Sequence, residues 1–262
     1  MSNVLCVTGM HRSGTSLVAC WLESSGLPIH DGRLFGPDLG NPRGHFEDLD
    51  FISLQSDAIK SQITQSHGWK VFSAKALGFQ KESLERAKRL AEERNRKFDR
   101  WGWKDPRTVL FLEQWKELIP QLKMILIWRP CGETAHSLVK RSRAARQAGG
   151  KNLEELPVIG MADSVKLWVS YNQILCRYKE RYSDDTILLP LSYIVYHDEE
   201  VIKLINDKLK IDLSYKPIAQ VFDPNLLHGC SFRATRWAIK SYELLYGSSK
   251  VENRLSHLSD RG

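Results

Sequence analysis

The stretch VLCVTGMHRSGTSLVACWL, residues 4–22, decides the fold. Its first five residues, VLCVT, form a short apolar run that is typical of a buried strand. Its last six, LVACWL, are apolar enough for a helix that packs on a sheet, and Gly26 is well placed to end that helix. The stretch therefore predicts a strand, a tight loop over residues 9–16, and a helix that begins directly after the loop.

The loop, GMHRSGTS, has the composition of an anion-binding site. A small-residue loop between a strand and a helix N-terminus brings backbone N–H groups together, and the helix dipole favours negative charge there. Arg12 adds a guanidinium, and three hydroxyl groups add further donors, those of Ser13, Thr15 and Ser16. The alternative is an ordinary glycine turn between a strand and a helix.

One position separates this loop from the nucleoside-triphosphate motif G-x-x-x-x-G-K-[ST]. Gly9, Gly14 and Ser16 fit the motif, but Thr15 stands where the lysine that grips phosphate is required. The loop's positive charge comes instead from Arg12. We therefore expect a phosphate-like ligand whose negative charge is balanced by Arg12 of the loop itself.

Length and composition indicate one soluble α/β domain, since the chain has 262 residues, 42% of them hydrophobic and 26% charged. A net charge of +7 suits an anionic ligand, an acidic partner or nucleic acid. The five cysteines are scattered, with no C-x-x-C pair, so we expect a reducing, cytoplasmic setting without a zinc site or disulfide framework. No apolar run reaches the ~18–20 residues of a membrane span, and the N-terminus lacks a signal-peptide pattern.

Further strands are predicted at residues 101–107, where the strand runs into a turn, at 122–128 and at 186–191, with a short one at 27–30. Helical patterns lie between them, at residues 49–63, 82–100, 108–118 with Thr108 as the cap, 133–146, 157–182, 198–209 and 237–246. This alternation predicts a single α/β domain over residues 1–246, with a central parallel sheet flanked by helices, and a polar, frayed tail at 247–262. Ligands bind at the carboxyl ends of such strands, so the loop at 9–16 and the turns at Lys104 and Arg129 should surround one crevice.

These residues resemble motifs of the sulfotransferase superfamily, whose enzymes take a sulfuryl group from 3′-phosphoadenosine 5′-phosphosulfate (PAPS). The resemblance implies a P-loop fold like that of the nucleotide kinases. The family's 5′-phosphosulfate loop reads P-[KR]-[ST]-G-T-[ST], and residues 11–16 match it with His11 in place of proline. The same Thr15 that departs from the triphosphate motif fits this one.

The family's 3′-phosphate site is an arginine at the end of a buried strand and a serine eight residues later, and Arg129 and Ser137 have that spacing. Tyr193 follows the strand at 186–191 as a family tyrosine near the adenosine does, although Ile194 replaces the glutamate of that pattern. The resemblance therefore implies a donor site made of His11, Arg12, Ser13, Gly14, Thr15, Ser16, Arg129, Ser137 and Tyr193.

Two other segments, NPRGHFED at 41–48 and WKDPR at 103–107, resemble bacterial-type sulfotransferases and, more distantly, the tyrosylprotein sulfotransferases. In the protein-tyrosine relatives a glutamate is the catalytic base and a lysine in a Lys-Asp-Pro turn assists transfer. Glu47 and Lys104 match these residues, and Arg12 is the other cation expected beside the leaving phosphate. Other candidates for the base are His45, Asp48 and His67. A glutamate serves as base if burial raises its pKa or if it takes the proton late.

Several of these residues have a structural alternative. In that alternative, Glu47 is a carboxylate that favours the dipole at a helix start. Lys104 is a surface lysine at a turn, and Arg129 forms a surface ion pair at the end of a strand. Arg107 is as well suited to bracing the turn through Asp105 as to binding substrate.

Two larger groups of side chains are expected to be structural. The basic face of the helix at 82–100 should be solvated rather than bind nucleic acid, because glutamates interleave with Arg86, Arg89, Arg94, Arg96 and Lys97. Tryptophans are more often core than part of an acceptor cleft, which applies to Trp69, Trp101 and Trp103.

The resulting hypothesis is an enzyme that moves a sulfuryl group from PAPS to a carbohydrate, lipid-linked or protein hydroxyl by in-line transfer with a glutamate base. No metal is expected, because a sulfuryl group carries less charge than a phosphoryl group. The alternatives are a P-loop-type phosphotransferase or NTPase of the same architecture, which Thr15 disfavours, and a non-catalytic nucleotide-binding module. No nucleic-acid-binding motif appears, and no pattern indicates an oligomeric state.

Overall fold

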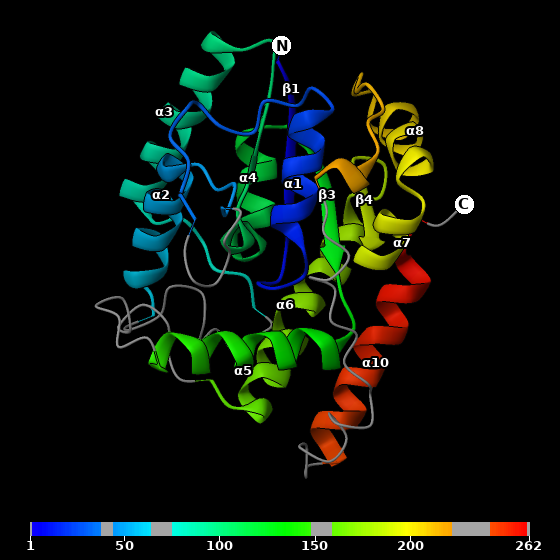
Figure 1. The fold of residues 1–262 in the computed structure, drawn as a ribbon. Coiled ribbons are helices and arrows are strands. Elements are labelled where there is room, and N and C mark those ends of the chain that lie inside the picture. The colour runs from blue at the N-terminus through cyan, green and yellow to red at the C-terminus, as the bar shows by residue number, and fades with distance from the viewer. Residues whose placement is uncertain (1, 38–43, 64–74, 148–158, 222–241, 261–262) are drawn as a thin grey trace.

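The strand that comes first in the chain lies inside the sheet, with a neighbour on each side. The computed structural model describes residues 2–37, 44–63, 75–147, 159–221 and 242–260. Its sheet has four parallel strands in the order β2-β1-β3-β4. They are β1 (Asn3–Gly9), β2 (Arg100–Lys104), β3 (Lys123–Trp128) and β4 (Thr186–Pro190). The predicted single α/β domain with a parallel sheet is therefore confirmed (Figure 1).

Helices cover both faces of the sheet. Successive side chains of each buried strand point to opposite faces, so each face contributes to a separate core. Leu5 and Val7 of β1 face a core shared with α1 (Thr15–Ser24), α7 (Leu191–Tyr196) and α8 (Asp198–Leu209). Val4 and Cys6 face a larger core. Its helices are α2 (Leu49–Lys60), α3 (Lys81–Lys97), the 3-10 helix η1 (Pro106–Phe111), α4 (Leu112–Leu118), α5 (Cys131–Gln147), α6 (Met161–Arg181) and α10 (Tyr242–Leu258). A second 3-10 turn, η2 (Ile218–Gln220), follows α8.

The carboxyl ends of the strands point toward α5, which crosses beneath them in the view of Figure 1. Three turns therefore meet at this edge, namely those that follow β1, β2 and β3. Ligands bind at the carboxyl ends of parallel strands, so this edge is where the ligand crevice was expected. The predicted site residues in these turns lie there.

Two predictions of secondary structure differ from the structure. Residues 27–30 form no strand. The carbonyl of Pro28 accepts a hydrogen bond from the N–H of Gly102 at 2.7 Å. Asp105, not Thr108, caps the helical turn after β2, because its side chain accepts the N–H of Arg107 at 2.8 Å. Thr108 instead accepts a bond from the indole of Trp103.

The C-terminal segment is also better ordered than expected. Residues 247–258 belong to α10 rather than to a frayed tail, since Val251 and Leu255 share one helical face and are buried in the larger core. Beyond the helix, the N–H of Asp260 donates to the carbonyl of Leu188 in β4. The start of the predicted 237–246 helix lies outside the described residues. None of the described helices is long and apolar enough to cross a membrane.

Candidate active site

The loop after β1 has a backbone suited to holding an anion. Arg12 and Gly14 have φ values of 69° and 87°, in the left-handed region, and α1 begins at Thr15. No side chain caps this helix, and its first turn contains no acidic residue. The hydroxyl of Ser13 is buried and has no hydrogen-bond partner among the described residues. A buried donor without a partner beside a helix N-terminus is what an anionic ligand would satisfy.

Two glycines let this loop approach its neighbours closely. A Cβ at Gly9 would clash with the carbonyl oxygen of Ile127 in β3. A Cβ at Gly14 would lie 2.5 Å from a methyl group of Leu191, the first residue of α7. The loop is therefore fitted against both β3 and the start of α7.

Arg12 reaches across the site from the loop to α5. Its Nε donates to the hydroxyl of Ser137 at 3.0 Å, so two residues predicted to contact different ends of the donor are brought together. Arg129 lies at the end of β3, where its Nε donates to Glu133 at 2.6 Å in the ion pair considered as its alternative. Tyr193 lies on α7 and donates its hydroxyl to Glu200 at 3.0 Å.

Glu47 and Lys104, expected as base and assisting cation, form a buried ion pair. Lys104 Nζ lies 2.7 Å from Oε1 of Glu47, and the two residues are 1% and 6% exposed. Arg107 approaches the other carboxylate oxygen, with Nη1 3.3 Å from Oε2. Lys104 is therefore not a surface lysine, and Glu47 does not cap a helix.

The two cations determine the protonation state of the carboxyl group. Burial alone would raise the pKa of Glu47, but Lys104 and Arg107 outweigh burial and lower it to about 2. Burial lowers the pKa of Lys104, because it disfavours the charged amine, and the nearby Glu47 carboxylate opposes that effect. The pKa of Glu47 is thus not raised, and of the two conditions for a glutamate base only late proton transfer remains.

A second layer of buried groups holds Arg107. Its Nη1 lies 2.9 Å from Oδ1 of Asp105, and Gln55 of α2 donates to the other oxygen of Asp105 at 2.9 Å. The indole of Trp115 donates to Gln55 at 3.2 Å. Arg107 therefore braces the turn through Asp105, as one of its two sequence interpretations proposed, and also contacts Glu47.

The segment that carries Glu47 is fixed by backbone pairing. The N–H of Phe35 donates to the carbonyl of Glu47 at 2.8 Å, and Leu34 forms an antiparallel bridge with Asp48. Asp48 is the N-cap of α2, where it accepts the N–H of Asp50 at 2.9 Å. Asp48 therefore has a structural role, which weakens it as a candidate base.

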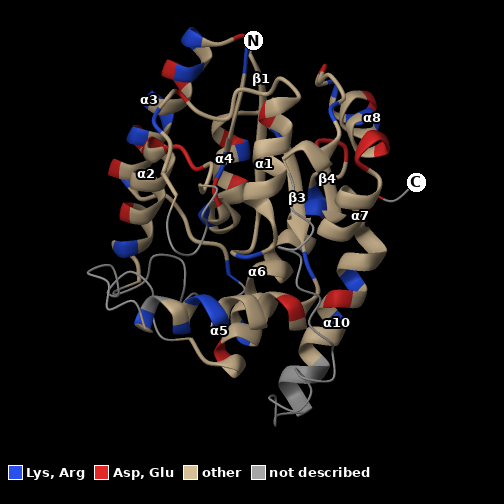
Figure 2. Cartoon of the chain, viewed as in Figure 1, with Lys and Arg blue, Asp and Glu red and all other residues tan. Residues whose placement is uncertain are grey.

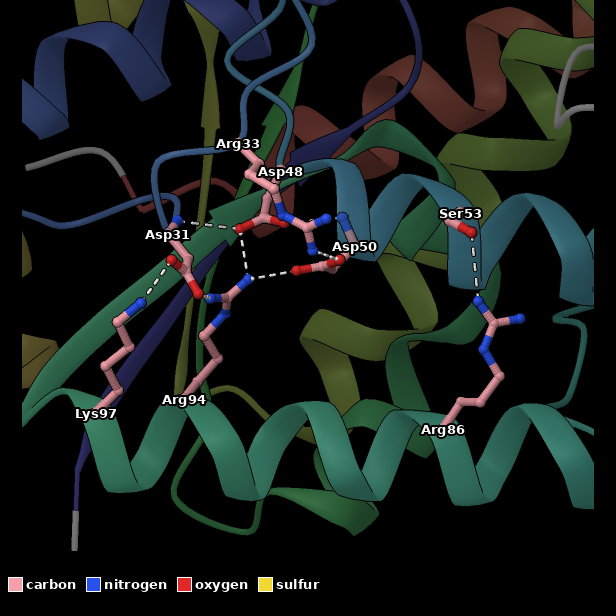
Figure 3. Close-up of polar contacts among 8 residues, drawn as sticks. All are labelled: Asp31, Arg33, Asp48, Asp50, Ser53, Arg86, Arg94 and Lys97. Carbon is pink, nitrogen blue, oxygen red and sulfur yellow. Dashed lines mark hydrogen bonds and ion pairs between the residues drawn. The ribbon is translucent and has the colours of Figure 1, made fainter.

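Arg94 of α3 anchors this same segment from below (Figure 3). Its guanidinium donates to Asp48 at 2.8 Å and to Asp50 at 3.0 Å, and it also pairs with Asp31. Arg94 is only 2% exposed, so the prediction of a solvated basic face is wrong at this position. It remains correct for the exposed Arg89 and Arg96.

Two histidines lie near the carboxylate. His45 is buried on the same segment as Glu47, against the ring of Phe35. His11 is buried against Tyr171 of α6, and its pKa is lowered well below the ordinary value by burial and then by Arg107, with Arg141 and Lys104 contributing. His67, the other histidine expected as a possible base, lies outside the described residues.

The site includes residues that the sequence did not single out. Arg141 lies one helical turn beyond Ser137 on α5 and is close enough to act on His11. Gln55 and Arg94 belong to helices whose local pattern gave no sign of such contacts. Figure 2 shows Lys and Arg on α5 and around the carboxyl ends of the strands. The described residues contain no cluster of His, Cys, Asp and Glu that would hold a metal ion.

Trp101 and Trp103 belong to the core, as expected, and not to an open cleft. Both are buried, and Trp103 stacks on Phe51 of α2 with ring centroids 4.6 Å apart. Trp69 and residues 41–43 of the NPRGHFED segment lie outside the described residues.

The chain shares its fold with solved sulfotransferase structures. No family model matches the chain, and no curated protein matches its sequence. Solved structures do match. The sulfotransferase domain from the curacin biosynthetic pathway gives a TM-score of 0.57 at 12% identity, with 98% of each chain covered.

Two further solved structures give the same result. The sulfotransferase domain from the Synechococcus PCC 7002 olefin synthase gives a TM-score of 0.53 at 16% identity, covering 100% of this chain and 96% of that one. Sulfotransferase STF9 from Mycobacterium avium gives 0.56 at 14% identity, covering 100% of this chain and 78% of that one. At these identities the likeness shows the fold, and the chain has the sulfotransferase fold.

Proposed function

We propose that this protein is a PAPS-dependent sulfotransferase that transfers a sulfuryl group to an acceptor hydroxyl. The observation that carries the proposal is the contact between Arg12 and Ser137 at 3.0 Å, within the sulfotransferase fold. It joins a loop suited to a phosphosulfate with a helix whose serine would meet the 3′-phosphate. A nucleotide with an anionic group at each end matches such a paired site better than a triphosphate does.

In this proposal the loop after β1 holds the 5′-phosphosulfate. Arg12, the buried hydroxyl of Ser13 and the N-terminus of α1 supply charge and hydrogen bonds. Arg129 and Ser137 hold the 3′-phosphate, because a guanidinium presents a planar fork that suits a phosphate. Glu133 then gives up part of its contact with Arg129 when the nucleotide enters.

Transfer itself uses the pair beside the loop. The acceptor oxygen forms a bond to sulfur while the bond from sulfur to the bridging phosphate oxygen breaks, which releases 3′-phosphoadenosine 5′-phosphate. Glu47 takes the hydroxyl proton, a task typically worth roughly 10²–10⁴-fold in rate. Lys104 stabilises the charge that develops on the bridging oxygen, and such preorganised donors contribute on the order of 3–4 kcal/mol.

The low pKa of Glu47 sets the timing of the proton transfer. A carboxylate this weakly basic accepts a proton only after the hydroxyl has become acidic through its bond to sulfur. We therefore propose a late proton transfer to a carboxylate that is ionised throughout the neutral range. The acceptor class stays as predicted, a hydroxyl of a carbohydrate, a lipid-linked molecule or a protein.

A thermal-shift comparison tests the proposal against its alternatives. We expect 3′-phosphoadenosine 5′-phosphate to raise the melting temperature, and ATP with magnesium or a random oligonucleotide to leave it nearly unchanged. Stabilisation by ATP–magnesium alone would indicate a phosphotransferase. Stabilisation by the oligonucleotide alone would indicate a nucleic-acid-binding module. A screen of hydroxyl acceptors with labelled PAPS then identifies the acceptor.

A further inference from the structure

The two cations on Glu47 are held very differently. Lys104 reaches Oε1 at the end of a flexible stem, and Glu47 is its only side-chain hydrogen-bond partner among the described residues. Arg107 contacts Oε2 while a second carboxylate, that of Asp105, holds the same Nη1 at 2.9 Å. Lys104 can therefore change partner by losing one hydrogen bond, whereas Arg107 is also held by Asp105.

The contacts that hold Arg107 extend through Asp105 to β1 and α2. Asp105 accepts the backbone N–H of Arg107 at 2.8 Å, and its own backbone carbonyl accepts the hydroxyl of Thr8 in β1 at 2.8 Å. Gln55 of α2 holds the remaining oxygen of Asp105. Because Asp105, Thr8 and Gln55 are fully buried, this chain fixes the guanidinium to the sheet and to α2.

We propose that Arg107 is the positioning residue of this site, which holds one oxygen of Glu47 in place when the bound donor draws Lys104 away from the other. This inference rests on the proposed function. A phosphosulfate in the loop after β1 brings new negative charge to the site. A lysine on a flexible stem transfers readily to such an anion, whereas an arginine whose Nη1 also pairs with the buried Asp105 does not.

Arg107 then preserves the ionised form of the base. Besides Lys104 and Arg107, the charged or titratable groups around Glu47 are Asp105, His45 and the buried His11 with Tyr171 behind it. If Lys104 moves to the donor, Arg107 is the cation left in hydrogen-bond contact with the carboxylate. Without it, a buried Glu47 beside Asp105 would take up a proton and could no longer act as a base.

Carbon-13 NMR of the Glu47 carboxyl group tests this directly, with the protein saturated with 3′-phosphoadenosine 5′-phosphate and Glu47→Gln used to assign the signal. In Arg107→Met we expect a titration midpoint about 1–3 pH units higher than in the unaltered protein, because an opposite charge is lost. Arg107→Lys should restore most of the difference. The matched control is Arg143→Met, at an exposed position on α5, which should leave the midpoint unchanged.

The same midpoint in Arg107→Met and the unaltered protein would overturn the inference. If Arg107→Met does not fold, nitrogen-15 spectra of the unaltered protein decide instead. The Arg107 guanidinium signals should stay sharp when the nucleotide is added, and their broadening would contradict a fixed guanidinium. Failure of the nucleotide to bind at all would instead refute the proposed function, and the inference with it.

Discussion

Arg12 and Ser137 are 125 positions apart in sequence, yet the guanidinium Nε of the first lies 3.0 Å from the hydroxyl of the second. This contact joins the loop after β1 to the helix after β3. Both segments follow strands that pair directly, with Gly9 opposite Ile127. The two ends of the proposed donor site are therefore parts of one rigid edge of the sheet.

Arg129→Ala should weaken binding of 3′-phosphoadenosine 5′-phosphate by about 10- to 150-fold, the equivalent of ~1.5–3 kcal/mol for a hydrogen bond to a charged group. Adenosine 5′-phosphosulfate lacks the 3′-phosphate, so its affinity should change little. Titration calorimetry with both ligands checks this, and the exposed Arg143→Ala on the next helix is the control. An equal loss for both ligands would contradict the assignment of Arg129.

Glu47→Gln should reduce turnover by roughly 10²–10⁴-fold, the usual contribution of a general base, while nucleotide affinity changes only slightly. An amide cannot accept the hydroxyl proton, yet it keeps the size of the side chain. Labelled PAPS with the acceptor found by screening measures the rate. Full activity in this variant would transfer the role of base to His45, Asp48 or His67.

Arg94→Met should destabilise the fold by roughly 3–5 kcal/mol, because it leaves Asp48 and Asp50 at the start of α2 without their buried cation. Arg96→Met on the exposed face of the same helix should change the unfolding free energy by less than about 0.5 kcal/mol. Urea unfolding of both variants measures the difference. Similar values for the two would show that the Arg94 ion pairs contribute little to stability.

Glu47 should also make stability depend on pH. Its pKa falls from an ordinary value of 4.5 to about 2 in the folded protein. Its ionised form therefore stabilises the fold fully above about pH 4.5, and this contribution disappears as the pH falls toward 2. The contribution is on the order of 3 kcal/mol. The difference in unfolding free energy between the unaltered protein and Glu47→Gln should be largest at pH 7 and shrink below pH 4.5; a constant difference would refute the ion-pair explanation.

Local sequence was sufficient for the elements with a strong periodic signal. The run VLCVT became β1, and the pattern over 198–209 became α8 with the same limits. The meeting of the turns at the strand ends followed from the rule for parallel sheets. The matches to Glu47 and Lys104 came from motif resemblance, and the structure adds that the two side chains form one buried pair.

Other features could not be predicted, because they depend on contacts between distant parts of the chain. Arg94 looked like any other cation on a charged helix, and its burial depends on acids 44 and 46 positions away. The polar composition of residues 247–258 concealed the three apolar positions, Val251, Leu255 and Leu258, that pack α10 against the core. The low pKa of Glu47 likewise requires two cations from beyond residue 100.

The place of β1 in the sheet has a consequence for biosynthesis. This strand leaves the ribosome before its partners, residues 100–104 and 123–127. Until those partners have been made, an apolar segment that becomes fully buried has no sheet to join. Such unpaired segments favour aggregation and chaperone binding. The yield of folded protein should therefore depend on how the nascent β1 segment is protected until β3 has emerged.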